Sequence, residues 1–123
     1  MELLVKGKQM KLYIAVLDAV PDFMVPTLVA HSVLSAHLVF SQTKLFNADP
    51  LYPIYIDWLE NSFRKVTLRV NQKEFDKIAA LQSVYLGHEN RTLQGRKSCA
   101  IALPCANEDR PNVLKFAHLW EPR

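Results

Sequence analysis

Residues 11–40 read KLYIAVLDAVPDFMVPTLVAHSVLSAHLVF, which predicts a buried β-strand followed directly by a helix. The stretch 12–17 is a continuous apolar run, typical of a strand that is covered on both faces. Asp18, Pro21 and Asp22 end the run with residues that favour turns. Because the first turn of a helix tolerates a residue without an N–H, Pro26 marks the start of a helix over 26–40.

The predicted helix is apolar on almost every side. Leu34 and Leu38 lie opposite its main apolar arc, so we expect a helix that is buried nearly all round. Its one narrow polar stripe consists of Thr27, His31 and Ser35, which are spaced four residues apart and therefore share one face. We expect this stripe to point into any functional site.

Composition indicates one ordered domain. The chain has 123 residues, of which 50% are hydrophobic and 22% charged, as in ordinary globular proteins. The apolar runs are too short or too interrupted to suggest a signal peptide or a membrane span. The net charge of +3 is compatible with a phosphate-bearing partner but does not require one.

The two cysteines indicate a reducing compartment. Cys99 and Cys105 are six residues apart, which matches neither a zinc motif nor a secreted disulfide framework. The four histidines show no metal-binding spacing, so we expect no metal. The three glycines form no phosphate-binding loop, and we expect no cofactor. A cytoplasmic location follows as an expectation.

The stretch 41–57, SQTKLFNADPLYPIYID, is predicted as an ordered loop, with a short helix over 55–61 as an option. It has no sustained period and contains Pro50 and Pro53. Its aromatic and aliphatic residues are too numerous for a solvated linker. It should therefore fold back on the domain, as a lid over the site, or form a subunit interface.

The second half of the chain predicts further alternation of strands and helices. Residues 63–70 alternate as in a strand, and Asn71 with Glu74 forms a capping box at the start of a helix over 72–85. Gly87 ends this helix.

A polar loop over 88–96 follows, and then the apolar run 98–103 predicts another central strand that Pro104 terminates. A helical turn over 108–113 and a strand over 116–120 close the chain. The order indicates a single α/β domain, a mixed sheet of about four strands with helices on both faces.

Two of these segments resemble the type 2 peptidyl-tRNA hydrolase family. GRKSCAIALP at 95–104 is similar to that family's glycine, variable pair, Ser or Thr and apolar strand ending in proline. WLENSFRKVTLRVNQKEFDKIAAL from position 58 is similar to its tryptophan, lysine-led strand and acidic-capped helix. The resemblance covers about 11–40 and 58–120. It implies a peptidyl-tRNA hydrolase II-like fold, hydrolysis of the ester between peptide and tRNA, and a homodimer.

The chain departs from the family at the site. Pro26 and Thr27 stand where the family has Gly-Lys, His31 replaces a glutamine and Leu34 replaces a histidine. A histidine in this region resembles an uncharacterised branch of the family. In the loop before Gly95, only Thr92 matches the family pattern.

We predict His31, Glu89 and Thr92 as catalytic residues. His31 would act as the base that activates water, because imidazole titrates near neutral pH, and Glu89 would orient it. Thr92 would donate to a carbonyl of the substrate. The predicted substrate-binding residues are Thr27, Ser35, Asn90, Arg91, Arg96, Lys97 and Ser98.

Plainer interpretations remain open at this point. His31 can be a buried structural histidine, and Glu89 and Asn90 can belong to an ordinary solvated turn. The Arg and Lys residues of this loop can be ordinary solvated surface groups. Hydrolysis of peptidyl-tRNA therefore competes with a non-catalytic module of the same fold that binds an RNA end, a small ligand or a protein. A third alternative is that the apolar segment 51–58 serves chiefly for oligomerisation.

Overall fold

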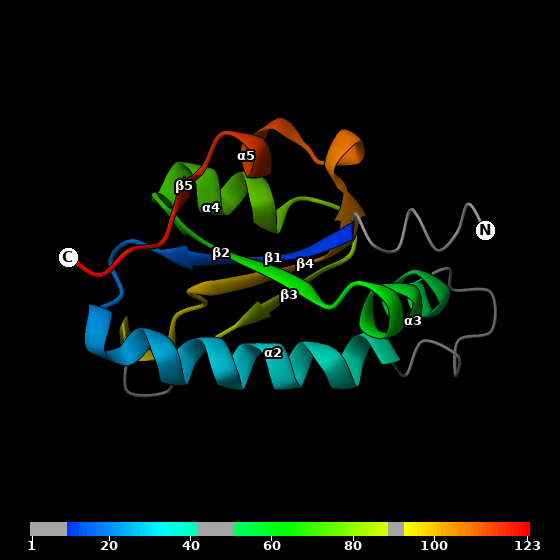
Figure 1. Cartoon of the computed structure of the whole chain (residues 1–123). Helices are drawn as coiled ribbons and strands as arrows, with labels where there is room; N and C mark the ends of the chain where they lie inside the picture. Colours follow the sequence, from blue (N-terminus) through cyan, green and yellow to red (C-terminus); the bar gives the residue numbers. More distant parts are fainter. Residues whose placement is uncertain (1–9, 42–50, 89–92) are drawn as a thin grey trace.

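The computed structural model describes residues 10–41, 51–88 and 93–123. Its elements form a mixed α/β domain around one sheet (Figure 1). In chain order they are β1 (Met10–Leu17), α2 (Val25–Ser41), α3 (Leu51–Asn61), β2 (Arg64–Val70), α4 (Gln72–Ala79), β3 (Val84–Gly87), β4 (Cys99–Ala106), α5 (Asn112–Lys115) and β5 (His118–Leu119). Short 3₁₀ turns cover Asp22–Met24, Leu93–Gly95 and Asn107–Asp109.

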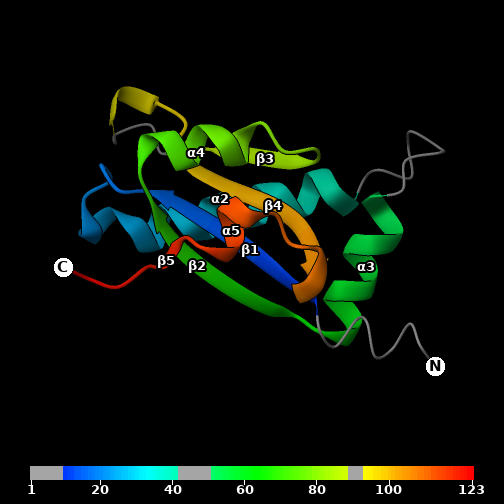
Figure 2. The same cartoon turned by 90° about the horizontal axis from the view of Figure 1, so that it is seen from above.

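The five-stranded sheet has the order β3-β4-β1-β2-β5. Strands β1 and β2 are parallel, whereas β4 is antiparallel to both β1 and β3, and β5 is antiparallel to β2. Helices α2 and α3 cover one face, and α4 and α5 cover the other (Figures 1 and 2). The prediction of helices on both faces is therefore confirmed, with one strand more than the four expected.

Strand β1 lies in the middle of the core. Its residues from Leu12 to Leu17 are each at most 3% exposed, as the continuous apolar run predicts. Burial of each large aliphatic side chain contributes roughly 1.5–3 kcal/mol. The capping box is also present, because Asn71 accepts from the Glu74 N–H and Glu74 accepts from the Asn71 N–H.

The prediction that α2 is buried nearly all round is wrong. The helix buries Leu28, Ser32 and Ala36 against the sheet, but Leu34 is 68% and Leu38 57% exposed. A helix that packs on one face of a sheet buries only one stripe of its own surface. Among the described residues, no element covers the opposite side of α2.

Helix α3 begins at Leu51, so the prediction of a loop over 41–57 is wrong for residues 51–57. The part of that loop over 42–50 lies outside the described residues. The described part of the segment, from Leu51, folds back on the domain as expected, but the alternative of a lid is wrong for it, because α3 lies at the opposite end of the sheet from the start of β4 (Figure 1). Tyr55 and Trp58 are 3% and 2% exposed, and the Trp58 indole N–H donates to the Arg64 carbonyl at 2.8 Å. The Tyr55 hydroxyl bonds His37 Nδ1 at 2.8 Å, consistent with a structural role for that histidine.

The predicted helix over 72–85 is too long. Helix α4 ends at Ala79, and Ser83 at φ +67° reverses the chain into strand β3. The four residues of β3 pair with β4, which supplies the hydrogen bonds. Pairing with a distant strand has overridden the local helical pattern here.

Strand β4 runs through Pro104 instead of ending there. The register with β1 shifts between the Lys11–Cys105 and Tyr13–Ala102 pairs, which leaves a bulge around the proline. At a bulge the missing N–H of proline removes no ladder bond.

The segment Asp22–Ser41 is long and apolar enough to span a membrane by length and composition alone. In the structure its buried residues, Leu28, Ser32 and Phe40 among them, belong to the face that packs on the sheet. Only 28% of the apolar window is buried, so the helix packs on the sheet along one side alone.

Candidate functional site

Three backbone hydrogen bonds align the strand ends at one edge of the sheet. The Leu17 N–H donates to the Ser98 carbonyl at 3.0 Å, and the Ser98 N–H donates to the Gly87 carbonyl at 2.9 Å. The Asp18 N–H donates to the Val70 carbonyl at 2.8 Å. The carboxyl ends of β1, β2 and β3 therefore meet the start of β4, on the left in Figure 1. We call this region the carboxyl edge.

The chain connections make this edge a favourable place for a ligand. From β1 the chain continues to α2 on one face, and from β2 it continues to α4 on the other (Figure 1). Where neighbouring parallel strands send their connections to opposite faces, a crevice opens beyond their carboxyl ends. The described residues of the predicted loop site, 88 and 93–98, reach the same edge, because Ser98 bonds to both Leu17 and Gly87 there.

One half of the carboxyl edge, at β3 and β4, is basic. Arg96 and Lys97 are exposed directly before Ser98. The Arg96 guanidinium donates to the Gln72 side-chain oxygen at the start of α4, and Lys97 Nζ lies 3.2 Å from His88 Nδ1. These contacts hold two cations over the strand ends, where an anionic group can reach them.

The other half, at β1 and β2, is largely neutralised. Asp22 Oδ1 lies 3.2 Å from Arg69 Nη1, and Asp22 Oδ2 accepts from the Arg123 N–H at 2.6 Å. The Arg123 N–H, followed by the guanidinium of Arg69, lowers the pKa of Asp22 against the opposing effect of desolvation. Arg69 also lies over the Trp120 ring, 5.0 Å from its centroid.

The predicted stripe on α2 faces solvent. Thr27 and His31 are exposed and Ser35 is half-buried, so the alternative of a buried His31 is wrong. In the described part of the chain no side chain hydrogen-bonds to the His31 ring. The residues one and two turns further along this face of α2 are Leu34 and Leu38, which are exposed as well.

Ser98 lies at the carboxyl edge but is fully buried. Its hydroxyl and that of Ser32, also fully buried, have no hydrogen-bond partner within the described ranges. The Ser32 hydroxyl lies close to the Cys99 thiol, but without the geometry of a good hydrogen bond. Burial raises the pKa of Cys99 to about 12, so this thiol is no nucleophile at neutral pH.

The other predicted residues, Glu89, Asn90, Arg91 and Thr92, lie outside the described residues, and their roles stay predictions. Among 10–41, 51–88 and 93–123 no three His, Cys, Asp or Glu side chains are grouped as metal ligands.

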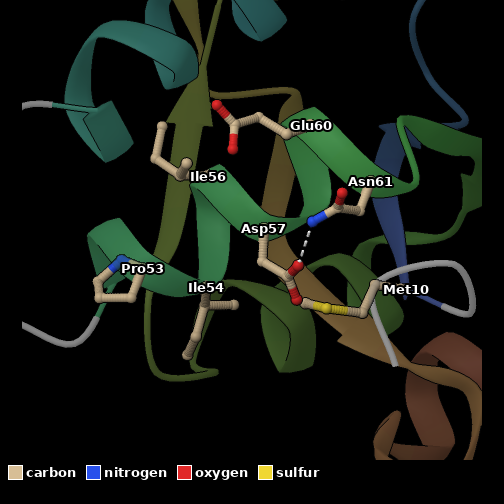
Figure 3. Close-up of a pocket in the computed structure, with 7 residues that line it drawn as sticks. All are labelled: Met10, Pro53, Ile54, Ile56, Asp57, Glu60 and Asn61. Carbon is tan, nitrogen blue, oxygen red and sulfur yellow. Dashed lines mark hydrogen bonds between the residues drawn. The ribbon is translucent and has the colours of Figure 1, made fainter. Parts of the chain in front are cut away.

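A separate groove of about 440 Å³ lies on α3 (Figure 3), toward the opposite end of the sheet (Figure 1). Its lining is mainly apolar, with Asp57 and Glu60 as its acidic groups. Asn61 donates to Asp57 at 2.7 Å. The groove suits an apolar group with a cationic end. Sequence reasoning missed it because the start of α3 was predicted as a loop; a helix from Leu51 would have placed Ile54, Asp57 and Asn61 together.

Comparison with known proteins does not extend this picture. No protein-family model matches the chain, and no curated protein matches it significantly.

Proposed function

We propose that this protein is a non-catalytic module of the peptidyl-tRNA hydrolase II-like fold that binds an RNA end at its carboxyl edge. The observation that carries the proposal is the pair of exposed cations, Arg96 and Lys97, held over the strand ends by Gln72 and His88. Cationic side chains bind phosphates without reading sequence. The sequence resemblance to an RNA-processing family supports the choice of RNA.

Three features favour binding over hydrolysis. The lysine of the family pattern is replaced by Thr27. His31 has no described partner to orient it as a base, and general base catalysis needs a positioned group. The Ser98 hydroxyl is buried and does not reach solvent.

The proposal is tested by fluorescence anisotropy with a labelled tRNA. Arg96→Gln/Lys97→Gln should weaken binding roughly 10- to 100-fold, because two charge-assisted contacts are lost. Arg64→Gln/Lys65→Gln is the matched control, since both residues are exposed at the start of β2, at the other end of the sheet. It should bind as the wild type does. Equal losses in both variants would indicate non-specific attraction and contradict the assignment.

Hydrolysis is tested separately, with purified peptidyl-tRNA as substrate. The proposal predicts no turnover by the folded wild type. Turnover that is lost in His31→Ala or Thr92→Ala would instead establish the hydrolase, with the histidine in place of the family lysine.

A further inference from the structure

A pocket of about 400 Å³ lies between helix α5 and strands β1, β2 and β5, and we call it the α5 pocket. Figure 2 looks onto this face of the sheet and shows α5 over β1 and β2. The pocket is separate from the carboxyl edge, because its β1 residues, Lys11 and Tyr13, lie in the first half of that strand. Its volume is within the range of about 300–1,000 Å³ that is usual for small-molecule sites.

Part of the pocket lining is apolar. Val66 and Leu68 of β2 line it together with Leu114 of α5, and Leu68 and Leu114 are buried. We call these three residues the apolar floor. Because side chains alternate along a strand, Lys11 and Tyr13 lie on the same side of β1. A mainly apolar lining with a few polar groups is typical of sites that hold the body of an organic ligand.

Three cations, Lys11, Arg110 and Lys115, also line the pocket, and none of its lining residues is acidic. In the described part of the chain every ion pair involves Asp22, so these three cations have no ion-pair partner there. Asp109, directly before Arg110, is exposed and does not line the pocket. Cations gathered around one apolar hollow raise the positive potential inside it, which favours an anion.

Arg110 carries the inference furthest. Its Nη1 donates to the Tyr13 hydroxyl at 3.2 Å, which ties the guanidinium to β1. Its Nε is buried and has no hydrogen-bond partner within the described ranges. A buried polar atom on a charged group costs free energy unless it is paired. A bound anion would supply the opposite charge that this guanidinium lacks.

We propose that the α5 pocket binds an organic anion, a carboxylate carried on a short apolar body. The carboxylate lies among the three cations, with Arg110 as its main partner. Bonds between a guanidinium and a carboxylate are stronger than bonds between neutral groups. The apolar body lies on the apolar floor. Inorganic phosphate would leave this floor in water, and a neutral hydrocarbon would leave the cations unpaired, so the two features together select the ligand class.

The first test is an NMR titration of the isotope-labelled full chain with octanoate. Octanoate should saturate the protein and shift amide signals in β1, β2 and α5. Acetate has the same head group without the body, and it should bind at least about 10-fold more weakly, as should inorganic phosphate, because neither buries apolar surface. Octylammonium has the same body with the opposite charge and should not shift these signals. Any binding of octylammonium in the groove on α3 would shift signals of that helix instead.

The second test uses variants, each shown to be folded by circular dichroism. Arg110→Gln should weaken octanoate binding about 10- to 100-fold, because a charge-assisted contact is lost. Lys115→Gln changes an exposed side chain and should weaken binding about 2- to 5-fold. Ala117→Phe fills the pocket without changing its charge and should prevent saturation. The matched control is Lys77→Gln, which is exposed on α4 on the same face of the sheet, does not line the pocket and should bind as the wild type does.

Absence of octanoate binding by the folded wild type overturns the proposal. Equal affinities for phosphate and octanoate overturn it as well, because the apolar floor then contributes nothing. Equal losses in Arg110→Gln and Lys77→Gln would indicate non-specific attraction and contradict the assignment. Octanoate should leave the anisotropy of labelled tRNA unchanged, since the carboxyl edge is a separate surface. Displacement of tRNA by octanoate would place both ligands on one surface and contradict a separate pocket.

Discussion

Gly87 in β3 lies directly against Ser32 of α2, and this contact predicts a large effect of adding one methyl group. A Cβ built on Gly87 would lie 2.2 Å from Ser32 Oγ, 2.9 Å from Ser32 Cβ and 3.4 Å from Ser32 Cα. The serine rotamer can relieve only the first contact. The second requires a shift of the helix or the strand, in a region where Ser32 is 0% exposed.

Overpacking of this kind destabilises a domain by about 1–3 kcal/mol. Because two contacts would be below 3.0 Å, we expect Gly87→Ala to lower the free energy of unfolding by about 2–3 kcal/mol. Ser32→Ala removes the closer contact and also a buried hydroxyl without a described partner, so alone it should be neutral or stabilising. In the Ser32→Ala background, Gly87→Ala should destabilise by only about 1 kcal/mol. The coupling energy is then about 1–2 kcal/mol.

The assay is urea unfolding of the four proteins of this double-mutant cycle, followed by circular dichroism. Gly95→Ala is the control. Its added Cβ meets no atom within 4 Å, but its φ of +77° makes the substitution unfavourable by about 1 kcal/mol whatever residue stands at 32. Equal losses for Gly87→Ala in both backgrounds, or a loss below about 0.5 kcal/mol, would refute this account of helix packing.

Two further predictions concern titratable groups. In a folded Cys105→Ser variant, the Cys99 thiol should react with iodoacetamide at pH 8 roughly 10³-fold more slowly than in the same chain unfolded in urea. The reason is that burial raises the pKa of Cys99 to about 12. Similar rates in the two states would contradict the burial of Cys99. The pKa of Asp22 is lowered in the folded state, so its contribution to stability is complete above its unfolded value of about 3.8 and is lost as the pH falls below it. Thermal unfolding from pH 7 to pH 3 should accordingly show that the difference in melting temperature between the wild type and Asp22→Asn becomes smaller at the acid end. A difference that stays constant with pH would exclude a stabilising ion pair at Asp22.

The sequence was most informative where one local pattern determines the structure. The apolar run of β1 and the capping box at Asn71 predict a central strand and a helix start, and both are present. Strand β3 could not be foreseen, because Val84 and Tyr85 continue the helical spacing and only pairing with β4 decides their conformation. The exposed side of α2 was not foreseen for a related reason, since an apolar residue such as Leu34 gives the same sequence pattern whether it is buried or exposed.

The candidate site was predictable in part. The position of Arg96 and Lys97 before a central strand follows from the sequence order. The sequence order does not predict the ion-pair cluster that neutralises the other half of the carboxyl edge, because Asp22 is 47 residues from Arg69 and 101 from Arg123. Such contacts depend on the tertiary fold alone.

The most direct test of the proposed function is the salt dependence of tRNA binding by the wild type and by Arg96→Gln/Lys97→Gln. Each phosphate contact to single-stranded nucleic acid contributes about 0.7 to the slope of log affinity against log salt concentration. If both cations contact phosphates, the variant should have a slope smaller in magnitude by about 1.4. An unchanged slope, or no tRNA binding by the folded wild type at low salt, would contradict RNA recognition at the carboxyl edge.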